Sequence, residues 1–353
     1  MKCIEEIDSN FAIKTTIKKD DIIFYDIDEQ PFMIHGIFKE NGKYRRMPEN
    51  IAKNISKGVF SLHTHTAGGR VRFSTDSCYV AIHAVMDGVS KMPHFACTGS
   101  IGFDLYEKES YIGTFVPPFD VENKYEGIIE FGNRKCRDIT INFPLYSTVS
   151  KLYIGLQKNS VIEKPSQYSN REPIVYYGSS ITQGGCASRP GMSYPAIISR
   201  KFDCDYINLG FSGNAKAEDE MIDHIKSLDM SIFVFDYDHN SPNTEHLKAT
   251  HEKMFKEIRK VHQKLPIILM SRPKYILTKK EEERRKIIET TYKNARSKGD
   301  EKVYFLDGRE LTAYCKDAGT VDNCHPTDFG FFSMSEALSK VIQDNCLLKN
   351  ELK

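Results

Sequence analysis

Hydrophobic and polar residues alternate along much of the first half of the chain. Ile139, Ile141 and Phe143 are separated by polar residues, and residues 78–82 and 152–156 repeat the same spacing. A period of two places alternate side chains on one face of a β-strand. Turn-forming stretches such as TAGGR and FVPPFD lie between these runs, and long amphipathic helical patterns are scarce. The pattern predicts that residues 1–160 form an antiparallel, jelly-roll-like β-sandwich.

The second half of the chain has a different rhythm. Five continuous apolar runs, in IVYYG, DYINLG, SIFVFDYD, PIILMSRP and VYFLDG, alternate with stretches of helical periodicity. Runs without alternation are typical of strands that are covered on both faces, as in a parallel sheet between helices. We expect residues 173–353 to form an α/β domain with a central five-stranded parallel sheet, joined to the sandwich by a polar linker at 161–172. The charged helix that begins at Lys279 is expected to be a solvated face.

Composition limits the binding partners and the cellular compartment that we expect for this protein. A chain of 353 residues is expected to form two domains, and its net charge of +1 gives no field that would attract nucleic acid or an anionic membrane. The N-terminal residues are acidic where a secretory signal would be apolar, and no run approaches the ~20 apolar residues of a membrane span. The nine cysteines form no CxxC pair, which argues against a disulfide framework or a zinc site. We expect a cytoplasmic protein with no nucleic-acid or membrane partner, no cofactor and no metal.

A Gly-Ser-Ser turn in YYGSSITQGG follows the first apolar run of the second half. A phosphate-binding P-loop would need a lysine after the later glycines, and a dinucleotide-binding loop would need glycine where Ser180 stands. In open α/β sheets, ligands bind at the carboxyl ends of the strands. Ser180 is therefore a candidate nucleophile, and the neighbouring Ser179 is the alternative.

A serine nucleophile needs a base, and the base needs a carboxylate that orients it. Asp322 and His325 lie three residues apart in TVDNCHPTDFG, just before the last helical pattern. The loops after the second and third runs contain Gly213 and Asn240, whose backbone N–H and side-chain amide are candidate donors to an oxyanion. Each feature alone is more often ordinary turn chemistry, but their position at successive strand ends predicts one catalytic edge.

These blocks resemble those of the GDSL/SGNH hydrolase superfamily, because GSS, GFSGN, DHNS and DNCH occur here in the family's order. The resemblance implies a flavodoxin-like three-layer α/β/α fold. It also implies Ser180 as nucleophile, His325 as base and Asp322 as the carboxylate that orients His325. The implied oxyanion hole consists of the N–H groups of Ser180 and Gly213 and the amide of Asn240.

Two blocks depart from the family pattern. Ser179 stands where the family has Asp, and Asp238 and Ser241 replace the Gly and Asp that flank the asparagine of the third block. The family's loop hydrogen bonds are therefore not expected to carry over unchanged at these positions. In the first half, the stretches TAGGRVRFSTDS (66–77) and FPLYSTVSKLYIGL (143–156) resemble, less specifically, the β-sandwich that precedes the hydrolase domain in a bacterial subgroup that includes some carbohydrate acetylesterases.

Other polar clusters have simpler explanations. His63 and His65 would share one face of a strand and could bind a metal, but no third ligand is near them in the sequence, so a polar strand face is favoured. Asp236, Asp238 and His239 could suggest a metal-assisted hydrolase, but alternate positions at a strand end would direct them apart.

The sequence and the resemblance together predict a serine esterase that removes a short acyl group, acetyl above all, from a carbohydrate or another small ester. The second half shows no long apolar lid such as a lipase would need. Arg272, just after the fourth run, is a candidate substrate contact, with an ordinary surface arginine as the alternative. The other hypotheses are a catalytically inactive carbohydrate-binding protein on a hydrolase scaffold, a thioesterase or lysophospholipase of the same family, and a metal-assisted hydrolase.

Overall fold

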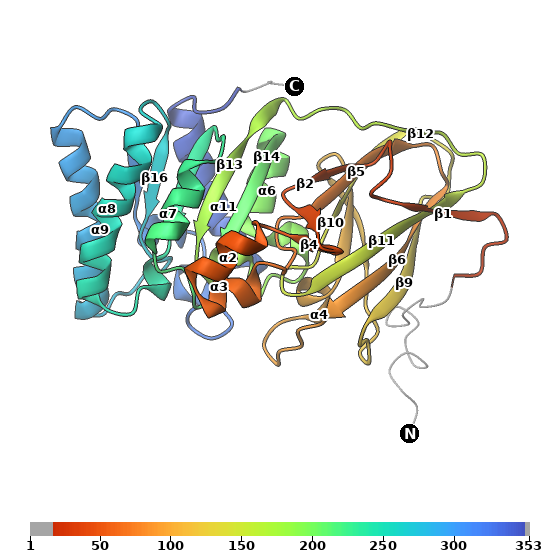
Figure 1. Cartoon of the computed structure of the whole chain (residues 1–353), viewed down its shortest axis with the longest axis horizontal. Coiled ribbons are helices and arrows are strands. Elements are labelled where there is room, and N and C mark those ends of the chain that lie inside the picture. Colours follow the sequence, from red (N-terminus) through yellow and green to blue (C-terminus); the bar gives the residue numbers. More distant parts are fainter. Residues whose placement is uncertain (1–16, 350–353) are drawn as a thin grey trace.

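The computed structural model describes residues 17–349, and the first half of this range contains two facing antiparallel sheets (Figure 1). One sheet has the strand order β1-β11-β6-β9, and the other has the order β12-β5-β10-β7-β8, with β2 also paired to β5. The strands are β1 (Ile22–Asp26), β2 (Met33–His35), β5 (Arg70–Thr75), β6 (Tyr79–Gly88), β7 (Phe103–Glu107), β8 (Ser110–Phe115), β9 (Lys124–Glu130), β10 (Arg137–Asn142), β11 (Thr148–Gln157) and β12 (Ile162–Glu163). The ends of the two predicted domains, residues 1–16 and 350–353, lie outside the described residues, as do the N-terminal residues considered as a signal.

The core between the two sheets follows the alternating pattern of the sequence. Ile139 and Ile141 of β10 and Leu152 and Ile154 of β11 are fully buried in one apolar cluster, while Thr140 between the first two is only partly buried. The prediction of an antiparallel sandwich is confirmed.

Three short helices interrupt the sandwich, where the sequence predicted only strands and turns. A hairpin of β3 (Phe38–Glu40) and β4 (Lys43–Arg45) leads into α2 (Glu49–Ile55) and α3 (Lys57–Leu62), and α4 (Cys97–Ser100) follows later in the chain. Ala52, Ile55 and Val59 have helical spacing, and they pack in the same cluster as the second half's sheet rather than between the sandwich sheets. Segment 49–62 therefore covers the neighbouring α/β layers.

The second half is built on one parallel sheet with the strand order β14-β13-β15-β16-β17. Numbered within this half, the order is 2-1-3-4-5, which is that of flavodoxin-like sheets. The strands are β13 (Asn170–Gly178), β14 (Cys204–Gly210), β15 (Ile232–Asp236), β16 (Ile267–Met270) and β17 (Val303–Leu306). The order reverses between β13 and β15, so the carboxyl end of β13 lies beside the crevice where such folds bind ligands.

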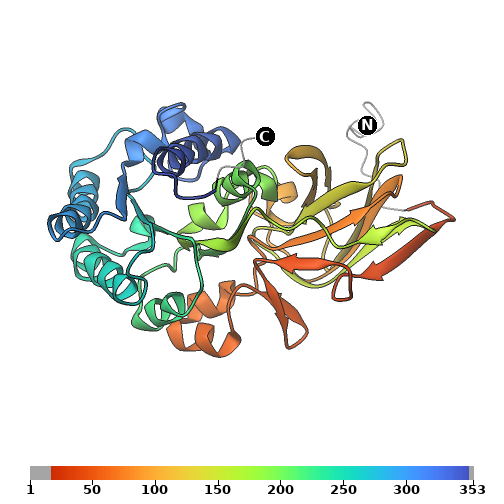
Figure 2. The same cartoon turned by 90° about the horizontal axis from the view of Figure 1, so that it is seen from above.

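Helices cover both faces of this sheet, as the continuous apolar runs predict (Figure 2). One face packs against α6 and α11, and the other packs against α7, α8 and α9 together with α2 and α3. The helices of this half are α5 (Ser180–Gln183), α6 (Tyr194–Phe202), α7 (Asp219–Lys226), α8 (Thr244–Val261), α9 (Lys279–Ser297), α10 (Gly308–Leu311) and α11 (Asp328–Asp344), with short 3₁₀ turns η2 (Pro190–Met192), η3 (Asp238–Asn240) and η4 (Lys316–Gly319). Among residues 17–349, no helix combines the length and the hydropathy needed to cross a bilayer.

Buried polar contacts join the sandwich to the α/β layers. Asp104 of β7 is fully buried and accepts hydrogen bonds from the Asn142 side chain (2.8 Å) and from the backbone N–H of Gly191 (2.8 Å). Arg70 of β5 forms an ion pair with Asp205 of β14. The linker also belongs to both halves, because it contains β12, which pairs with β5, and because β13 begins at Asn170. The boundary at 161–172 remains a prediction.

Candidate active site

The Gly-Ser-Ser turn places Ser180 at the first position of α5, directly after β13. Ser179 caps this helix, since its Oγ accepts a hydrogen bond from the N–H of Ile181 at 3.2 Å, and its side chain is fully buried. Ser180 retains 7% of its surface. Gly178 must be glycine, because a Cβ there would lie 2.1 Å from the carbonyl oxygen of Asp236. The two serines therefore differ in role, with Ser179 as a helix cap and Ser180 as the residue that faces the site.

Ser180, His325 and Asp322 are joined in one chain of hydrogen bonds. The Ser180 Oγ lies 2.9 Å from Nε2 of His325, and Nδ1 of the same ring lies 2.7 Å from Oδ2 of Asp322. The other carboxylate oxygen of Asp322 accepts from the backbone N–H of His325 (2.7 Å) and of Cys324 (3.1 Å). Partial burial alone would raise the pKa of Asp322, but these hydrogen bonds with His325 outweigh it and lower that pKa. The loop thus keeps the carboxylate ionised against Nδ1.

The predicted oxyanion donors lie at the ends of the neighbouring strands. Gly213 follows β14 with a φ of +70°, a conformation that favours glycine, and no atom lies within 4 Å of the position its Cβ would take. Asn240 ends η3, and its Oδ1 accepts a hydrogen bond from the N–H of Ala215 at 3.2 Å. This contact ties the second and third loops together and leaves the amide end of Asn240 as its donor. Ser180, at the first position of α5, has an N–H that the helix itself cannot use.

Gln183 connects the nucleophile turn to the loop of Gly213. Its Oε1 accepts from the N–H of Ser212 (3.1 Å), and its Nε2 donates to the carbonyl oxygen of Leu145 (3.1 Å). The same Nε2 lies 3.2 Å from Nδ1 of His65. Burial, with the nearby positive charge of Arg46, lowers the pKa of His65 to about 3, so this ring is neutral and can accept. A residue of the nucleophile helix is thus fixed by two residues of the sandwich half.

The sandwich half also contacts Ser180 and His325 themselves. The hydroxyl of Tyr146 donates to the backbone carbonyl of Ser180 at 3.3 Å. The ring of His94, on an exposed loop, lies 6.0 Å from the ring of His325, centre to centre. These residues were not identified from the sequence. Gln183 could have been found from its place in the same helical turn as Ser180, but His94 and Tyr146 precede the nucleophile by many residues and carry no motif.

Arg272 supports the loop of Asn240 rather than pointing to open solvent. Its guanidinium binds Asp238 (Nε to Oδ2, 3.0 Å) and Glu281 (Nη1 to Oε1, 3.0 Å). Asp238 is almost fully buried and also accepts from Nε of Arg284 at 2.7 Å. Burial alone would raise the pKa of Asp238, but the charges of Arg272 and Arg284 lower it to about 2. The residues that depart from the family blocks therefore have their own contacts here. Ser179 caps α5, and Asp238 binds two arginines.

Arg284 corrects the expectation for the charged helix. It belongs to α9, which begins at Lys279 and was expected to be only a solvated face. Its side chain is 5% exposed and also donates to the carbonyl oxygens of Asp238 and Ser241. The polar sequence of α9 does not indicate that Arg284 is buried, because its partner, Asp238, lies in a distant loop.

Three potential metal ligands meet beside the base. One nitrogen of His94, the sulfur of Cys186 and one nitrogen of His325 lie within 4.8 Å of one another. Burial, together with the nearby charge of Asp322, raises the pKa of Cys186 to about 12, so a metal would have to displace its proton. A cation there would compete with Ser180 for Nε2 of His325, since Asp322 holds the other ring nitrogen.

The clusters considered earlier have other partners. His63 and His65 were expected on a strand, but they follow α3. His63 lies 2.8 Å from a guanidinium nitrogen of Arg45. Asp236 accepts from the hydroxyl of Thr182 at 3.0 Å, on the side of β15 that faces α5. Among residues 17–349 it forms no ion pair with Arg272 or Arg284, which bind its neighbour Asp238.

Comparisons with known proteins agree with this architecture. Residues 171–343 match the GDSL-like lipase/acylhydrolase family, and residues 22–162 match GxDLY, the N-terminus of the SGNH-hydrolase type of esterase. The chain reads GFDLY at residues 102–106, so the sequence that gives the domain its name contains the buried Asp104. Among curated proteins, none matches.

Several solved structures share nearly the whole chain. A protein described as a GDSL-like lipase from Bacteroides ovatus is 26% identical, with a TM-score of 0.83 over 93% of this chain and 99% of that one. The salicylyl-acyltransferase SsfX3 from a tetracycline biosynthetic pathway is 17% identical, with a TM-score of 0.77 and the same coverage. A family two carbohydrate esterase from Cellvibrio japonicus is 11% identical, with a TM-score of 0.63 over 93% and 99%. The chain belongs to the GDSL/SGNH hydrolases that carry an N-terminal esterase domain, and it is an enzyme that hydrolyses ester bonds.

Proposed function

We propose that this enzyme is a serine esterase that releases a short acyl group, acetyl above all, from a carbohydrate ester. The observation that carries the proposal is the unbroken hydrogen-bond chain from Ser180 through His325 to Asp322. A hydroxyl within 2.9 Å of an imidazole whose other nitrogen is held by a carboxylate is the arrangement that activates a serine near neutral pH.

The first half-reaction makes an acyl-enzyme. The Oγ of Ser180 attacks the ester carbonyl carbon while its proton passes to Nε2 of His325, and Asp322 stabilises the imidazolium through Nδ1–H. The negative charge that develops on the carbonyl oxygen is accepted by the N–H groups of Ser180 and Gly213 and by the amide of Asn240. The tetrahedral intermediate then collapses, the C–O bond of the ester breaks, and His325 gives its proton to the leaving alcohol.

The second half-reaction repeats these steps with water. His325 takes a proton from water, the resulting hydroxide adds to the acyl carbon, and the Ser180 Oγ leaves with the proton of the imidazolium. One ester and one water are consumed, and one alcohol and one carboxylic acid are formed.

The surroundings of Ser180 support a short acyl group. Ser180 is 7% exposed, and a Cβ added to the adjoining Gly185 would lie 2.9 Å from the hydroxyl of Tyr146. The turn is therefore packed directly against the sandwich, which leaves little width for a long chain. The carbohydrate part rests on fold-level analogy to the family two carbohydrate esterase and to an acetyl xylan esterase from Butyrivibrio proteoclasticus.

Two matched variants test the nucleophile. Ser180→Ala should reduce ester hydrolysis by about 10³-fold or more, because removing the nucleophile of such a triad removes the covalent route. Ser179→Ala is the control, because it removes a neighbouring hydroxyl that caps α5 but keeps Ser180. A Ser180→Ala enzyme with wild-type turnover, or a Ser179→Ala enzyme without any, would contradict the assignment.

Two substrate series test the acyl group and the alcohol. Rates on nitrophenyl esters should fall as the acyl chain lengthens from acetyl, and acetate should be released from acetylated sugars or polysaccharides. A preference for long chains would refute the short-acyl proposal. Absence of fluorophosphonate labelling at Ser180, together with binding to glycans, would instead favour a catalytically inactive carbohydrate-binding protein.

A further inference from the structure

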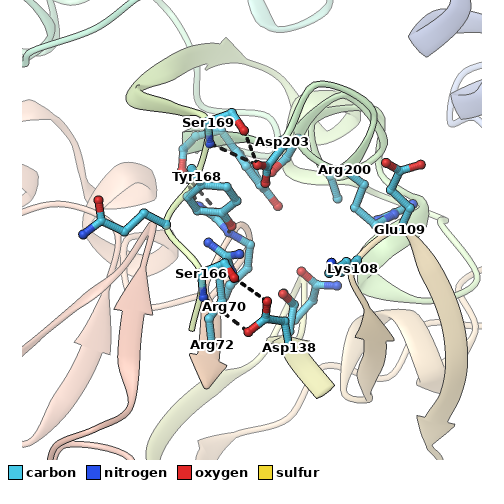
Figure 3. A pocket seen from close by; sticks show the side chains of 16 residues that line it. Arg70, Arg72, Lys108, Glu109, Asp138, Ser166, Tyr168, Ser169, Arg200 and Asp203 are labelled. Carbon is cyan, nitrogen blue, oxygen red and sulfur yellow. Dashed lines mark hydrogen bonds between the residues drawn. The ribbon is translucent and has the colours of Figure 1, made fainter. Parts of the chain in front are cut away.

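A cavity of about 240 Å³ lies between the sandwich and the α/β layers (Figure 3), and Ser180 is not among its lining residues. Its wall includes Arg72 of β5, Asp138 of β10, Tyr168 of the linker and Arg200 of α6. It lies at the amino end of β13, whereas Ser180 follows the carboxyl end of that strand. The nine residues of β13 span roughly 30 Å at about 3.3 Å each, so the cavity is not part of the active site.

Two arginines in this wall, Arg72 and Arg200, form no ion pair among residues 17–349. The charge of Arg200 acts on the buried Asp104, where it opposes the rise in pKa that burial causes. Arg72 is 7% exposed, and its buried Nε has no hydrogen-bond partner. Arg200 has a buried Nη1 that also has none. Each guanidinium instead lies on a tyrosine ring, Arg72 at 3.9 Å from the centre of Tyr168 and Arg200 at 4.1 Å from that of Tyr106. Stacking holds each guanidinium plane in place but uses none of its N–H groups.

The neighbouring Arg70 shows what a partnered arginine looks like in the same wall. It forms an ion pair with Asp205, and its Nε donates to the hydroxyl of Tyr168 at 3.2 Å. A buried guanidinium without such partners is costly, because burial removes the water that would otherwise solvate its charge. The unpaired N–H groups of Arg72 and Arg200 are therefore available to a ligand in the cavity that accepts hydrogen bonds.

Two of the three acids of the wall are engaged by other groups, and the third, Glu109, is exposed at the rim. Asp138 accepts from the N–H (3.3 Å) and the hydroxyl (2.5 Å) of Ser166, and Asp203 accepts from the N–H (3.0 Å) and the hydroxyl (2.7 Å) of Ser169. Figure 3 shows these two carboxylates at opposite edges of the cavity, with Arg72 and Arg200 reaching in from opposite sides. Lys108, which is exposed, adds a third positive charge at the rim.

We propose that this cavity is a binding site for a small anion that carries a phosphate or carboxylate group, held between the guanidinium groups of Arg72 and Arg200. A phosphate and a carboxylate each present a pair of oxygens that matches the paired N–H donors of a guanidinium. The cavity is smaller than a typical pocket for a drug-sized ligand, so a phosphate, a sugar phosphate or a sugar acid fits the available volume. The site goes beyond the proposed esterase function and does not depend on it.

Calorimetric titration tests the site with three probes, which are inorganic phosphate, glucose 6-phosphate and glucuronate, against chloride at constant ionic strength. At least one probe should bind, and the pattern distinguishes a phosphate from a carboxylate ligand. Arg200→Gln and Arg72→Lys should each weaken binding about tenfold, since each removes one paired contact. Arg309→Gln is the control, because it removes one positive charge from a side chain that is 44% exposed and outside this cavity.

The readout is binding, so it is independent of catalysis. Ser180→Ala protein should bind the probe as the wild type does, whatever becomes of its esterase activity. Two results would overturn the proposal. One is that no probe binds the folded wild-type protein at millimolar concentration, and the other is that Arg200→Gln and Arg309→Gln bind it with equal affinity. Arg200 is only partly buried, so its variant keeps the test valid even if a change at Arg72 prevents folding.

Discussion

Asp236→Asn offers a sharp test of how the nucleophile turn is held. Asp236 ends β15 and is fully buried. Its Oδ2 accepts from the hydroxyl of Thr182 in α5, and its Oδ1 has no hydrogen-bond partner. Burial, together with the negative charge of Asp238, raises the pKa of Asp236 from 3.8 to about 8. In the folded enzyme this carboxyl therefore keeps its proton at neutral pH.

The pKa of about 8 gives both the sign and the size of the effect. Between pH ~4 and pH ~8 the folded state holds a proton that the unfolded state has released, so the free energy of unfolding falls as the pH rises. The slope for one proton is about 1.4 kcal/mol per pH unit, and across the window the loss sums to roughly 6 kcal/mol as an upper limit. Below pH ~4 both states are protonated and the contribution of Asp236 to stability is fully present. Asparagine has no proton to lose, so Asp236→Asn should remove this slope.

Urea unfolding of both proteins between pH 5 and pH 8 measures the difference. We expect the wild type to lose stability relative to Asp236→Asn as the pH rises, while esterase activity persists because the asparagine oxygen still accepts from Thr182. Asp223→Asn is the matched control, because its carboxylate is 72% exposed on α7. If Asp236→Asn and the wild type have parallel pH profiles, Asp236 is ionised in the folded state and the reasoning fails.

Three further changes probe the site directly. Asp322→Asn should lower kcat by about 10⁴-fold, because the amide favours the wrong tautomer of His325, and steady-state kinetics on a nitrophenyl acetate would show it. Gln183→Leu leaves the N–H of Ser212 without its acceptor and should lower kcat by about tenfold or more with little change in KM, which steady-state kinetics would measure. Zn²⁺ should inhibit by binding His94 and His325 together with a nearby thiol, and His94→Ala should raise the concentration that gives half-inhibition.

The second half was predictable because its signals are local. Each strand is a continuous apolar run, and the positions that it buries, such as Tyr176 and Val234 on one face and Tyr177 and Phe235 on the other, follow from both faces being covered. Ser180, Gly213 and Asn240 each follow a strand, so the parallel sheet alone brings them to one edge. The strand order came from the resemblance, since runs of apolar residues do not say which strands are neighbours.

The first half was less predictable because part of it packs on a distant partner. Ala52, Ile55 and Val59 lie in two helices of only seven and six residues, which are too short for their apolar spacing to indicate a helix without the α/β core that they cover. The same holds for Arg284, whose burial depends on Asp238. Contacts of this kind are created by the folded chain, and the sequence does not show which partner a short apolar face or a single buried charge will meet.

The sandwich is part of the proposed active site, because its residues bind atoms of the turn that contains Ser180 and Gln183. Tyr146 holds the carbonyl of Ser180, and the carbonyl of Leu145 holds Gln183, which in turn positions the loop of Gly213. These contacts persist only while the two halves keep their relative placement, and Asp104 contributes to that placement through its buried bond to Gly191. Geometry at Ser180 is therefore coupled to the interface between the halves, so a substitution in the GFDLY segment can reach the nucleophile without touching it.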